Sequence, residues 1–156
     1  MATELRHGTF ARIFLKMDAE VKVRARKALT ELALAVERQA KINARNGAHK
    51  YRTPTPARPG EGPARISGAL GRAITHTPVK YVGGDFECKV GMAVGTYPPY
   101  NKRTPSNKYA YYLENGLLNN SSNKYPFLKP AYDFATKVPA VLIYNEAFGS
   151  DWRTIG

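Results

Sequence analysis

The residue of this chain with the most suggestive chemistry is Glu114, which lies in a short segment rich in tyrosine. A carboxylate in a tyrosine-lined pocket could act as a general base. No second acid, histidine or nucleophile lies near Glu114 at a spacing typical of catalytic sites. We therefore favour a structural acid, which accepts hydrogen bonds from backbone N–H groups or pairs with a Lys or Arg. An enzyme built on Glu114 is kept as an alternative.

Residues that could bind a metal or attack a substrate are sparse elsewhere. His7, His49 and His76 are scattered, and no two of them have the spacing of metal ligands on a helix. One cysteine cannot make a cysteine-based zinc site. That cysteine, Cys88, falls on the apolar side of a predicted strand, which favours a buried structural thiol over a nucleophile. We expect no catalytic residue and no metal site.

The glycine pairs of the chain carry no nucleotide-binding signature. Gly68-x-x-Gly71 and Gly83-Gly84 match neither a phosphate-binding loop nor a dinucleotide fingerprint, because no Gly-Lys-Ser/Thr follows a predicted strand. We therefore expect no cofactor.

Two predicted loops, 48–64 and 95–108, combine basic residues with tyrosines and prolines. Basic side chains interleaved with aromatic ones can hold phosphates and stack on bases. The candidate contacts to DNA or to an acidic partner are Lys50, Arg52, Arg58, Lys102, Arg103 and Lys108. The sequence contains no recognisable nucleic-acid-binding module. Nucleic-acid binding through these loops is therefore the alternative function.

Composition limits the protein class. The chain has 156 residues, which suits a single domain, 1–156, with a lead-in at 1–17 and a tail at 149–156. Lys and Arg number 24 and Asp and Glu number 12, a net charge of +12 that favours an acidic partner. One cysteine excludes an internal disulfide, and there is neither a signal peptide nor an apolar run that could span a membrane. We expect the cytoplasm, or a particle assembled there.

Apolar periodicity predicts the helices. Apolar residues three and four apart, without Gly or Pro, predict a long helix over 18–45, with Asp18 as its N-cap and Asn46-Gly47 after its end. A short helix is predicted over 67–74, capped by Ser67.

The last helix is predicted to follow Pro126 and to reach about residue 148, with a break or kink at Pro139. Its inward-facing residues are predicted to be Ala131, Phe134, Ala135 and Val138.

Strand signals gather in the middle of the chain. Residues 79–82 and the alternating stretch 86–92 read as strands joined by a tight turn at Gly83-Gly84. Residues 109–113 fit a helix or a strand equally well. The expected fold is α+β: a long N-terminal helix packed on a small, mostly antiparallel sheet, with a C-terminal helix and long basic loops.

Three blocks resemble those of a known protein family. They are Ser-Gly-Ala-Leu-Gly-Arg-Ala-Ile at 67–74, Tyr-Ala-Tyr-Tyr-Leu-Glu-Asn-Gly at 109–116 and Pro-Phe-Leu-Lys-Pro-Ala at 126–131. In order and spacing, after a long helix, they resemble the neck or tail-completion family of tailed bacteriophages, similar to the gene-ten tail component of lambdoid siphophages. The chain departs from the family at Ile66, Ala73 and 115–117. The motif and interface residues so implied are Ser67, Gly68, Leu70, Arg72, Tyr109, Glu114, Gly116, Pro126, Phe127, Leu128 and Pro130.

The resemblance implies a non-enzymatic subunit of a homo-oligomeric ring in the virion, at the head–tail junction around the DNA channel. Its partners would be further copies of itself, the neighbouring neck and tail proteins (head closure, tail terminator or tail tube) and, transiently, phage DNA. No membrane contact is implied. Within this interpretation, Glu114 and Gly116 set a turn, 126–131 fixes the last helix, and 117–124 contacts a neighbouring subunit.

Overall fold

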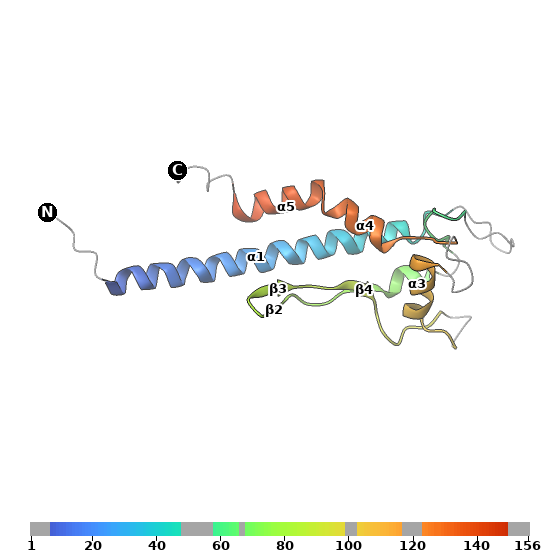
Figure 1. Ribbon diagram of the computed structural model, residues 1–156, viewed down its shortest axis with the longest axis horizontal. Coiled ribbons are helices and arrows are strands. Elements are labelled where there is room, and N and C mark those ends of the chain that lie inside the picture. The colour runs from blue at the N-terminus through green and yellow to red at the C-terminus, as the bar shows by residue number, and fades with distance from the viewer. Residues whose placement is uncertain (1–6, 48–57, 66–67, 99–102, 117–122, 150–156) are drawn as a thin grey trace.

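The computed structural model describes residues 7–47, 58–65, 68–98, 103–116 and 123–149. The fold is α+β, as expected: helix α1 (His7–Asn43) forms the axis, α4 (Leu128–Ala135) and α5 (Val138–Phe148) lie along one side of it, and the β-strands along the other (Figure 1). At 1.5 Å per residue, α1 is about 56 Å long. Its N-terminal part extends beyond the strands and α5 (Figure 1).

Helix α1 begins earlier than the sequence indicated. Its first residue is His7, so 7–17 are part of the helix rather than a separate lead-in, and Asp18 is not an N-cap. The Asp18 carboxylate instead accepts a hydrogen bond from Lys22 Nζ at 2.7 Å, one turn further along. Residues 9–17 contain no Gly or Pro, so nothing in them prevents helical hydrogen bonding. The predicted end is close, because α1 stops at Asn43, shortly before Asn46-Gly47.

The strands form one long hairpin with a break in the middle. β2 (Lys80–Val82) pairs antiparallel with β3 (Asp85–Glu87) across the predicted Gly83-Gly84 turn. β1 (Ile74–His76) pairs antiparallel with β4 (Val90–Met92), in a register that sets Ile74 opposite Met92. The predicted single strand 86–92 is therefore two strands, and β1 falls partly where a helix had been predicted.

Between the two strand pairs, Thr77 links both sides of the hairpin. Its N–H donates to the Lys89 carbonyl oxygen at 2.8 Å, and its hydroxyl accepts from the Lys89 N–H at 3.0 Å. The Cys88 thiol donates to the Thr77 carbonyl oxygen at 3.0 Å. Cys88 is half-buried rather than buried as expected, although a structural contact for its thiol is found.

Two short helices close the end of the hairpin nearer the core. α2 (Ala69–Ala73) starts after Gly68, which has a left-handed φ of 73° and occupies the N-cap position that had been assigned to Ser67. Ser67 itself lies outside the described residues. α3 (Ser106–Asn115) settles the ambiguous segment 109–113 as helix.

The predicted C-terminal helix is two helices that meet at Thr136 and Lys137, earlier than the predicted break. Pro139 lies in the first turn of α5, where a missing N–H costs no helical hydrogen bond. The burial of the predicted inward-facing residues is mixed. Phe134 and Val138, predicted to face inward, are 53% and 66% exposed, whereas Ala131 and Ala135 are buried as predicted.

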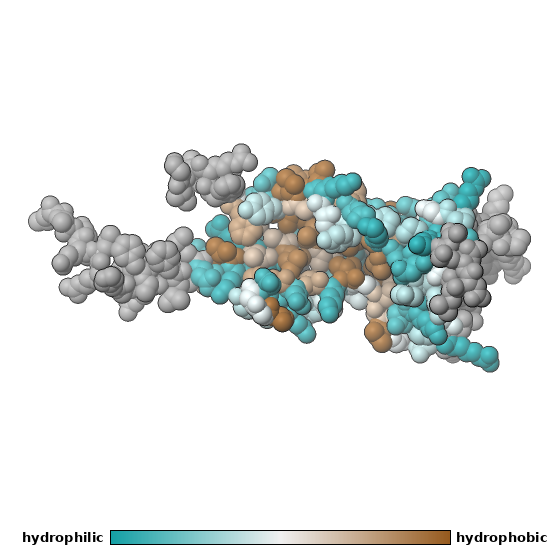
Figure 2. Space-filling model, viewed as in Figure 1, coloured by the Kyte–Doolittle hydropathy of each residue, from teal (hydrophilic) through white to brown (hydrophobic). Residues whose placement is uncertain are grey.

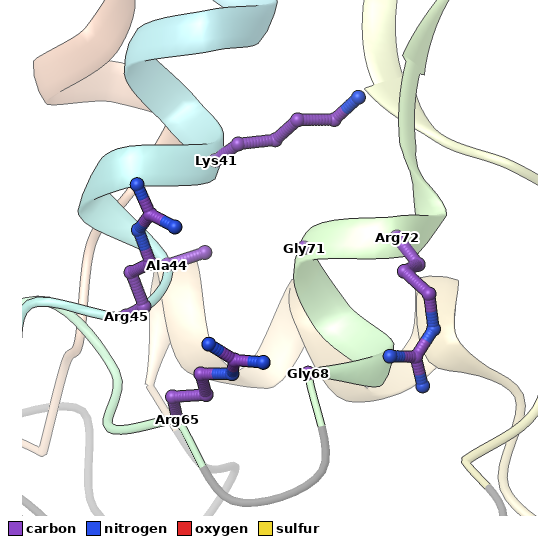
Figure 3. Close-up of a pocket in the computed structure, with 7 residues that line it drawn as sticks. All are labelled: Lys41, Ala44, Arg45, Arg65, Gly68, Gly71 and Arg72. Atoms are coloured by element: carbon purple, nitrogen blue, oxygen red, sulfur yellow. The ribbon is translucent and has the colours of Figure 1, made fainter.

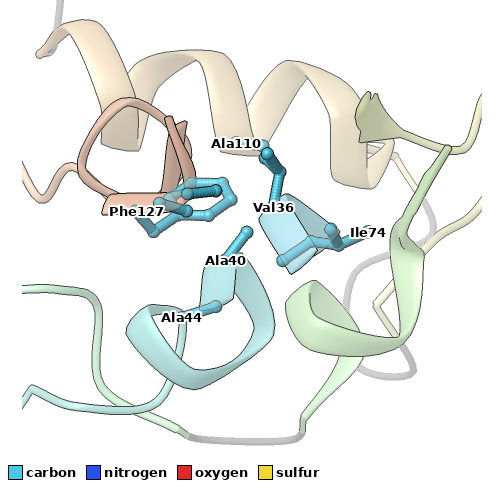
Figure 4. Packing of buried hydrophobic residues seen from close by; sticks show 8 residues of the cluster. Val36, Ala40, Ala44, Ile74, Ala110 and Phe127 are labelled. Carbon is cyan, nitrogen blue, oxygen red and sulfur yellow. The ribbon is translucent and has the colours of Figure 1, made fainter. Parts of the chain in front are cut away.

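The core lies where α1, α3, α4 and β1 meet. It is built mostly from alanines, which let the helices approach closely, around the fully buried ring of Phe127 (Figure 4). The buried residues of this cluster are Val36, Ala40, Ala44, Ile74, Ala110, Phe127, Ala131 and Ala135.

Candidate interaction surfaces

Glu114 is a helix cap that acts across a loop. It lies near the end of α3, and its carboxylate accepts three backbone hydrogen bonds at the start of α4. Oε2 accepts from the N–H groups of Phe127 at 2.9 Å and Leu128 at 3.0 Å, and Oε1 accepts from Lys129 at 2.8 Å. A negative charge at this place is also favoured by the helix dipole. The favoured interpretation, a structural acid bound by backbone N–H groups, is confirmed.

Pro130 completes this arrangement. The first four N–H groups of a helix have no partner within the helix. In α4 the first three, from Phe127 to Lys129, donate to Glu114, and the fourth position is Pro130, which has no N–H group. Glu114 and Pro130 therefore explain how all four backbone positions at the start of α4 avoid an unpaired N–H group.

Phe127 is also held from α1. The Asn43 side-chain amide donates to the Phe127 carbonyl oxygen at 3.1 Å, and Gln39 Nε2 donates to Asn43 Oδ1 at 2.9 Å. Close by, the Tyr125 N–H donates to the Leu113 carbonyl oxygen at 2.7 Å. Backbone and side-chain hydrogen bonds thus fix both ends of the segment 117–122. That segment, and with it most of the predicted neighbour contact at 117–124, lies outside the described residues.

A first candidate surface is the outer side of α5. No residue of this helix is buried, and its exposed apolar residues include Leu142, at 62% exposure. The only Asp, Glu, Lys or Arg in its eleven residues is Glu146. Figure 2 shows apolar side chains gathered where α5 lies in Figure 1. The members of this surface, which we call the α5 ridge, are Phe134, Val138, Val141, Leu142 and Tyr144.

A second surface is an apolar groove between α1, β4 and α4. Its cavity has a volume of about 510 Å³. Glu114 and Lys129 are the charged residues at its edge. The Glu114 carboxylate is already engaged by the three N–H groups of α4, so the groove walls are mainly hydrocarbon. They are formed by Leu29, Leu32, Ala33, Val36, Cys88, Val90, Leu128 and Tyr132.

A third surface is a basic hollow between the end of α1 and α2, with a volume of about 300 Å³ (Figure 3). We call it the arginine pocket. Four of the residues that line it are cationic and none is acidic, and it is lined by Lys41, Ala44, Arg45, Arg65, Gly68, Gly71 and Arg72. Of these residues, Gly68 and Arg72 had been singled out in the sequence, so Arg72 is the one cation of the pocket that was predicted. The i,i+4 spacing of Lys41 and Arg45 indicates a basic patch at the end of α1, but nothing in the sequence places Arg65 and Arg72 beside it.

A polar cluster beside this pocket joins α1 to β1. His76 Nδ1 lies 2.5 Å from Glu37 Oε2, and Lys41 Nζ contacts the other Glu37 oxygen. Burial raises the pKa of Glu37. The hydrogen bonds with His76 and Lys41 together lower it by more, so the pKa is below its ordinary value of 4.5. His76 therefore has a structural contact.

The remaining residues predicted from the three blocks divide between core and surface. Leu70 and Leu128 pack against the core, Gly116 is buried and caps α3 with a positive φ of 91°, and Tyr109 and Arg72 are exposed. Pro126 precedes the buried Phe127. The three blocks therefore lie around the start of α4 and the arginine pocket.

Of the predicted DNA or acidic-partner contacts, Lys50, Arg52 and Lys102 lie outside the described residues. Arg58, Arg103 and Lys108 are all exposed. Arg103 and Lys108 lie just before and within α3, whereas Arg58 belongs to the stretch that runs beside the end of α1.

Within the described part of the chain, no group of three or more His, Cys, Asp and Glu side chains could hold a metal ion. Across the same ranges, no helix combines the length and the apolar character needed to cross a bilayer. Comparisons with protein families, with curated proteins and with solved structures found no match.

Proposed function

We propose that this protein is a structural subunit of a ring at the head–tail junction of a tailed bacteriophage, where it joins tail to head around the DNA channel. The resemblance of the three blocks suggests the setting. The observation that carries the proposal is the presence of two dissimilar apolar surfaces on one subunit, the α5 ridge and the apolar groove. Head-to-tail contacts join two different patches of the subunit, and a convex apolar surface can pack into a concave one.

The α5 ridge fits a protein contact because burying it would be favourable. Each exposed apolar side chain there could contribute roughly 1.5–3 kcal/mol if it were fully removed from water. Large contiguous apolar patches are uncommon on monomeric proteins and mark interaction sites. The single acidic residue Glu146 leaves little charge to desolvate.

The groove supplies the second half of a contact between copies. A closed ring is built from heterologous contacts, in which one patch of each subunit meets a different patch of the next. We therefore assign the α5 ridge of one copy to the apolar groove of its neighbour. Copies that each carry a charge of +12 repel one another, so contacts between them favour surfaces with few cations. Both surfaces meet that condition, since Lys129 is the only Lys or Arg among their residues.

The proposal is tested by placing a charge on the ridge. In Leu142→Glu the new carboxylate lies on an exposed helix face, so the subunit should fold while its assembly is lost. The matched control is Val94→Glu, because Val94 is apolar, 87% exposed and outside both surfaces. Mass is measured by size-exclusion chromatography with light scattering, and rings are sought by electron microscopy of the purified chain and of the parent particle.

We expect the wild-type chain and Val94→Glu to form the same closed ring, alone or on the parent particle, and Leu142→Glu to remain monomeric with an unchanged circular dichroism spectrum. Absence of a ring in both settings would reject the ring function. A ring that forms equally well with Leu142→Glu would keep that function but reject the α5 ridge as its contact.

A further inference from the structure

The arginine pocket gathers positive charge without internal compensation. Lys41 is paired with Glu37, but Arg45, Arg65 and Arg72 form no ion pair with any residue in the described ranges. These arginines come from three separate places in the fold: the turn after α1, the stretch before α2, and α2 itself. Like charges brought together by the fold repel each other, and a bound anion would remove that repulsion.

Two of the guanidinium groups lie close together beside Gly68. A Cβ atom placed on Gly68 would lie 3.2 Å from Arg72 Nη1 and 3.5 Å from Arg65 Nε. Because residue 68 is glycine, no side chain fills the space between these two guanidinium groups. Figure 3 shows Arg65 extending between the end of α1 and Gly68, on the side of the hollow that faces Arg45.

The donor chemistry fits a phosphate group. A guanidinium carries a rigid, planar set of N–H donors that binds phosphate oxygens in pairs. Three such groups from different directions match a tetrahedral anion, which offers acceptors on all sides, better than a planar carboxylate. The pocket volume of about 300 Å³ leaves ample room for one phosphate.

Basic residues continue beyond the pocket, which favours a polyanion over a single ion. The Gly60 N–H donates to the Lys124 carbonyl oxygen at 2.7 Å, so the stretch that carries Arg58 runs against Lys124. The same stretch reaches the end of α1, where the Gly47 N–H donates to the Pro63 carbonyl oxygen at 3.4 Å. Arg58, Lys124 and the arginine pocket thus share one end of the molecule.

We infer that the arginine pocket binds a backbone phosphate of a nucleic acid. Arg65 and Arg72 are the central ligands, and Arg45 lies at the wall formed by α1. This inference concerns the surface of a single subunit and stands apart from the ring proposal, because neither the α5 ridge nor the apolar groove shares a residue with the pocket.

The test is a binding titration of the full chain with a fluorescently labelled DNA duplex of ~20 base pairs, at salt concentrations from about 50 to 200 mM. The pocket variant is Arg65→Gln with Arg72→Gln. The control is Arg24→Gln with Arg38→Gln, which removes the same charge from two exposed arginines of α1 outside the pocket. A further variant, Gly71→Glu, brings a carboxylate into the pocket at a position where a Cβ meets open space.

We expect the pocket double variant to bind DNA at least about tenfold more weakly, and the slope of log affinity against log salt to fall by about one, for the one phosphate that both arginines contact. Gly71→Glu should weaken binding similarly, and the control by less than about twofold. Equal losses in the pocket and control variants would overturn the inference, because they would show general attraction to a basic surface.

Two further measurements decide the occupant. Inorganic phosphate, compared with chloride at equal ionic strength, should raise the Tm of the wild type and leave the pocket double variant unchanged. A rise with phosphate but no DNA binding would assign the pocket to a small phosphate compound and overturn a nucleic acid as its ligand. Competition by polyglutamate as strong as that by DNA would overturn it in favour of an acidic protein.

Discussion

The carboxylate of Glu114 accepts a hydrogen bond of 2.9 Å from the backbone N–H of Phe127, and this contact fixes the point at which α4 begins. Among the described residues, Phe127 has the most buried aromatic ring; it is also the N-cap residue of α4, and Glu114 holds it there. We therefore expect substitutions of Glu114 to lower the stability of the fold rather than to abolish a catalytic activity.

We predict that Glu114→Gln lowers the free energy of unfolding by about 1–2 kcal/mol, because the amide keeps one acceptor oxygen but loses the charge and the second acceptor. Urea denaturation measures the effect. Glu146→Gln is the control, since Glu146 is exposed on α5. If Glu114→Gln abolished a measurable enzymatic turnover while the stability stayed unchanged, the role of Glu114 as a helix cap would be contradicted and the enzyme alternative supported.

We predict that Glu37→Gln destabilises the protein by about 1–2 kcal/mol near neutral pH, because Glu37 binds both His76 and Lys41. The effect should depend on pH in a defined direction. The pKa of Glu37 in the folded chain is lower than its ordinary value of 4.5. Its stabilisation is therefore fully present above about pH 4.5 and is lost as the pH falls through the lower folded value.

Thermal unfolding of wild type and Glu37→Gln between neutral and acid pH checks this. The difference between them should be constant down to about pH 4.5 and shrink below it. Glu20→Gln, which removes an exposed acid of the same helix, should show little difference at any pH. A gap between wild type and Glu37→Gln that grows on acidification would contradict the role given to Glu37.

Two glycine-to-alanine substitutions should act in opposite directions. A Cβ on Gly62 would lie 2.2 Å from the Asn43 carbonyl oxygen, a backbone atom that cannot move away alone, so Gly62→Ala should destabilise the protein by roughly 2 kcal/mol or more. A Cβ on Gly71 meets open space inside α2, so Gly71→Ala should stabilise it by about 0.5–1 kcal/mol. Chemical denaturation of both variants would refute the structural assignment if the two shifts had the same sign.

The sequence was sufficient where local chemistry decides the structure. The long helix, the Gly83-Gly84 turn and the role of Glu114 as a structural acid follow from spacing and residue type, and the α+β fold is as expected. For the helix and the turn, neighbouring residues along the chain or a rule about glycine and proline were enough. Glu114 was assigned because it lacks catalytic partners in the sequence, and the N–H groups that it binds are 13 to 15 residues away.

Prediction from the sequence failed where residues far away along the chain determine the local structure. The two residues directly before Ile74, Arg72 and Ala73, are neither Gly nor Pro and do not mark the change from helix to strand, and Ile74 becomes a strand residue because Met92 pairs with it. Phe134 and Val138 fit a helical stripe, but both are exposed; the chain turns at Thr136 and Lys137, so Val138 belongs to a separate helix and does not continue the buried face of Ala131 and Ala135. The arginine pocket was missed for the same reason, since its cations lie in three segments that only the fold brings together.

Two hydrogen bonds join the residues on either side of the segment 117–122, and they have a consequence for protein engineering. Tyr125 is bonded to Leu113, and Phe127 to Glu114, so the chain leaves α3 and enters α4 through a closed base whose geometry is set from outside the segment. The entropy cost of a loop grows only slowly with its length, by about 0.6 kcal/mol for each doubling. An affinity tag or a reporter peptide inserted at 119–120 should therefore leave α4 in place, so its effect on assembly would report on the contact that we expect 117–124 to make with a neighbouring subunit.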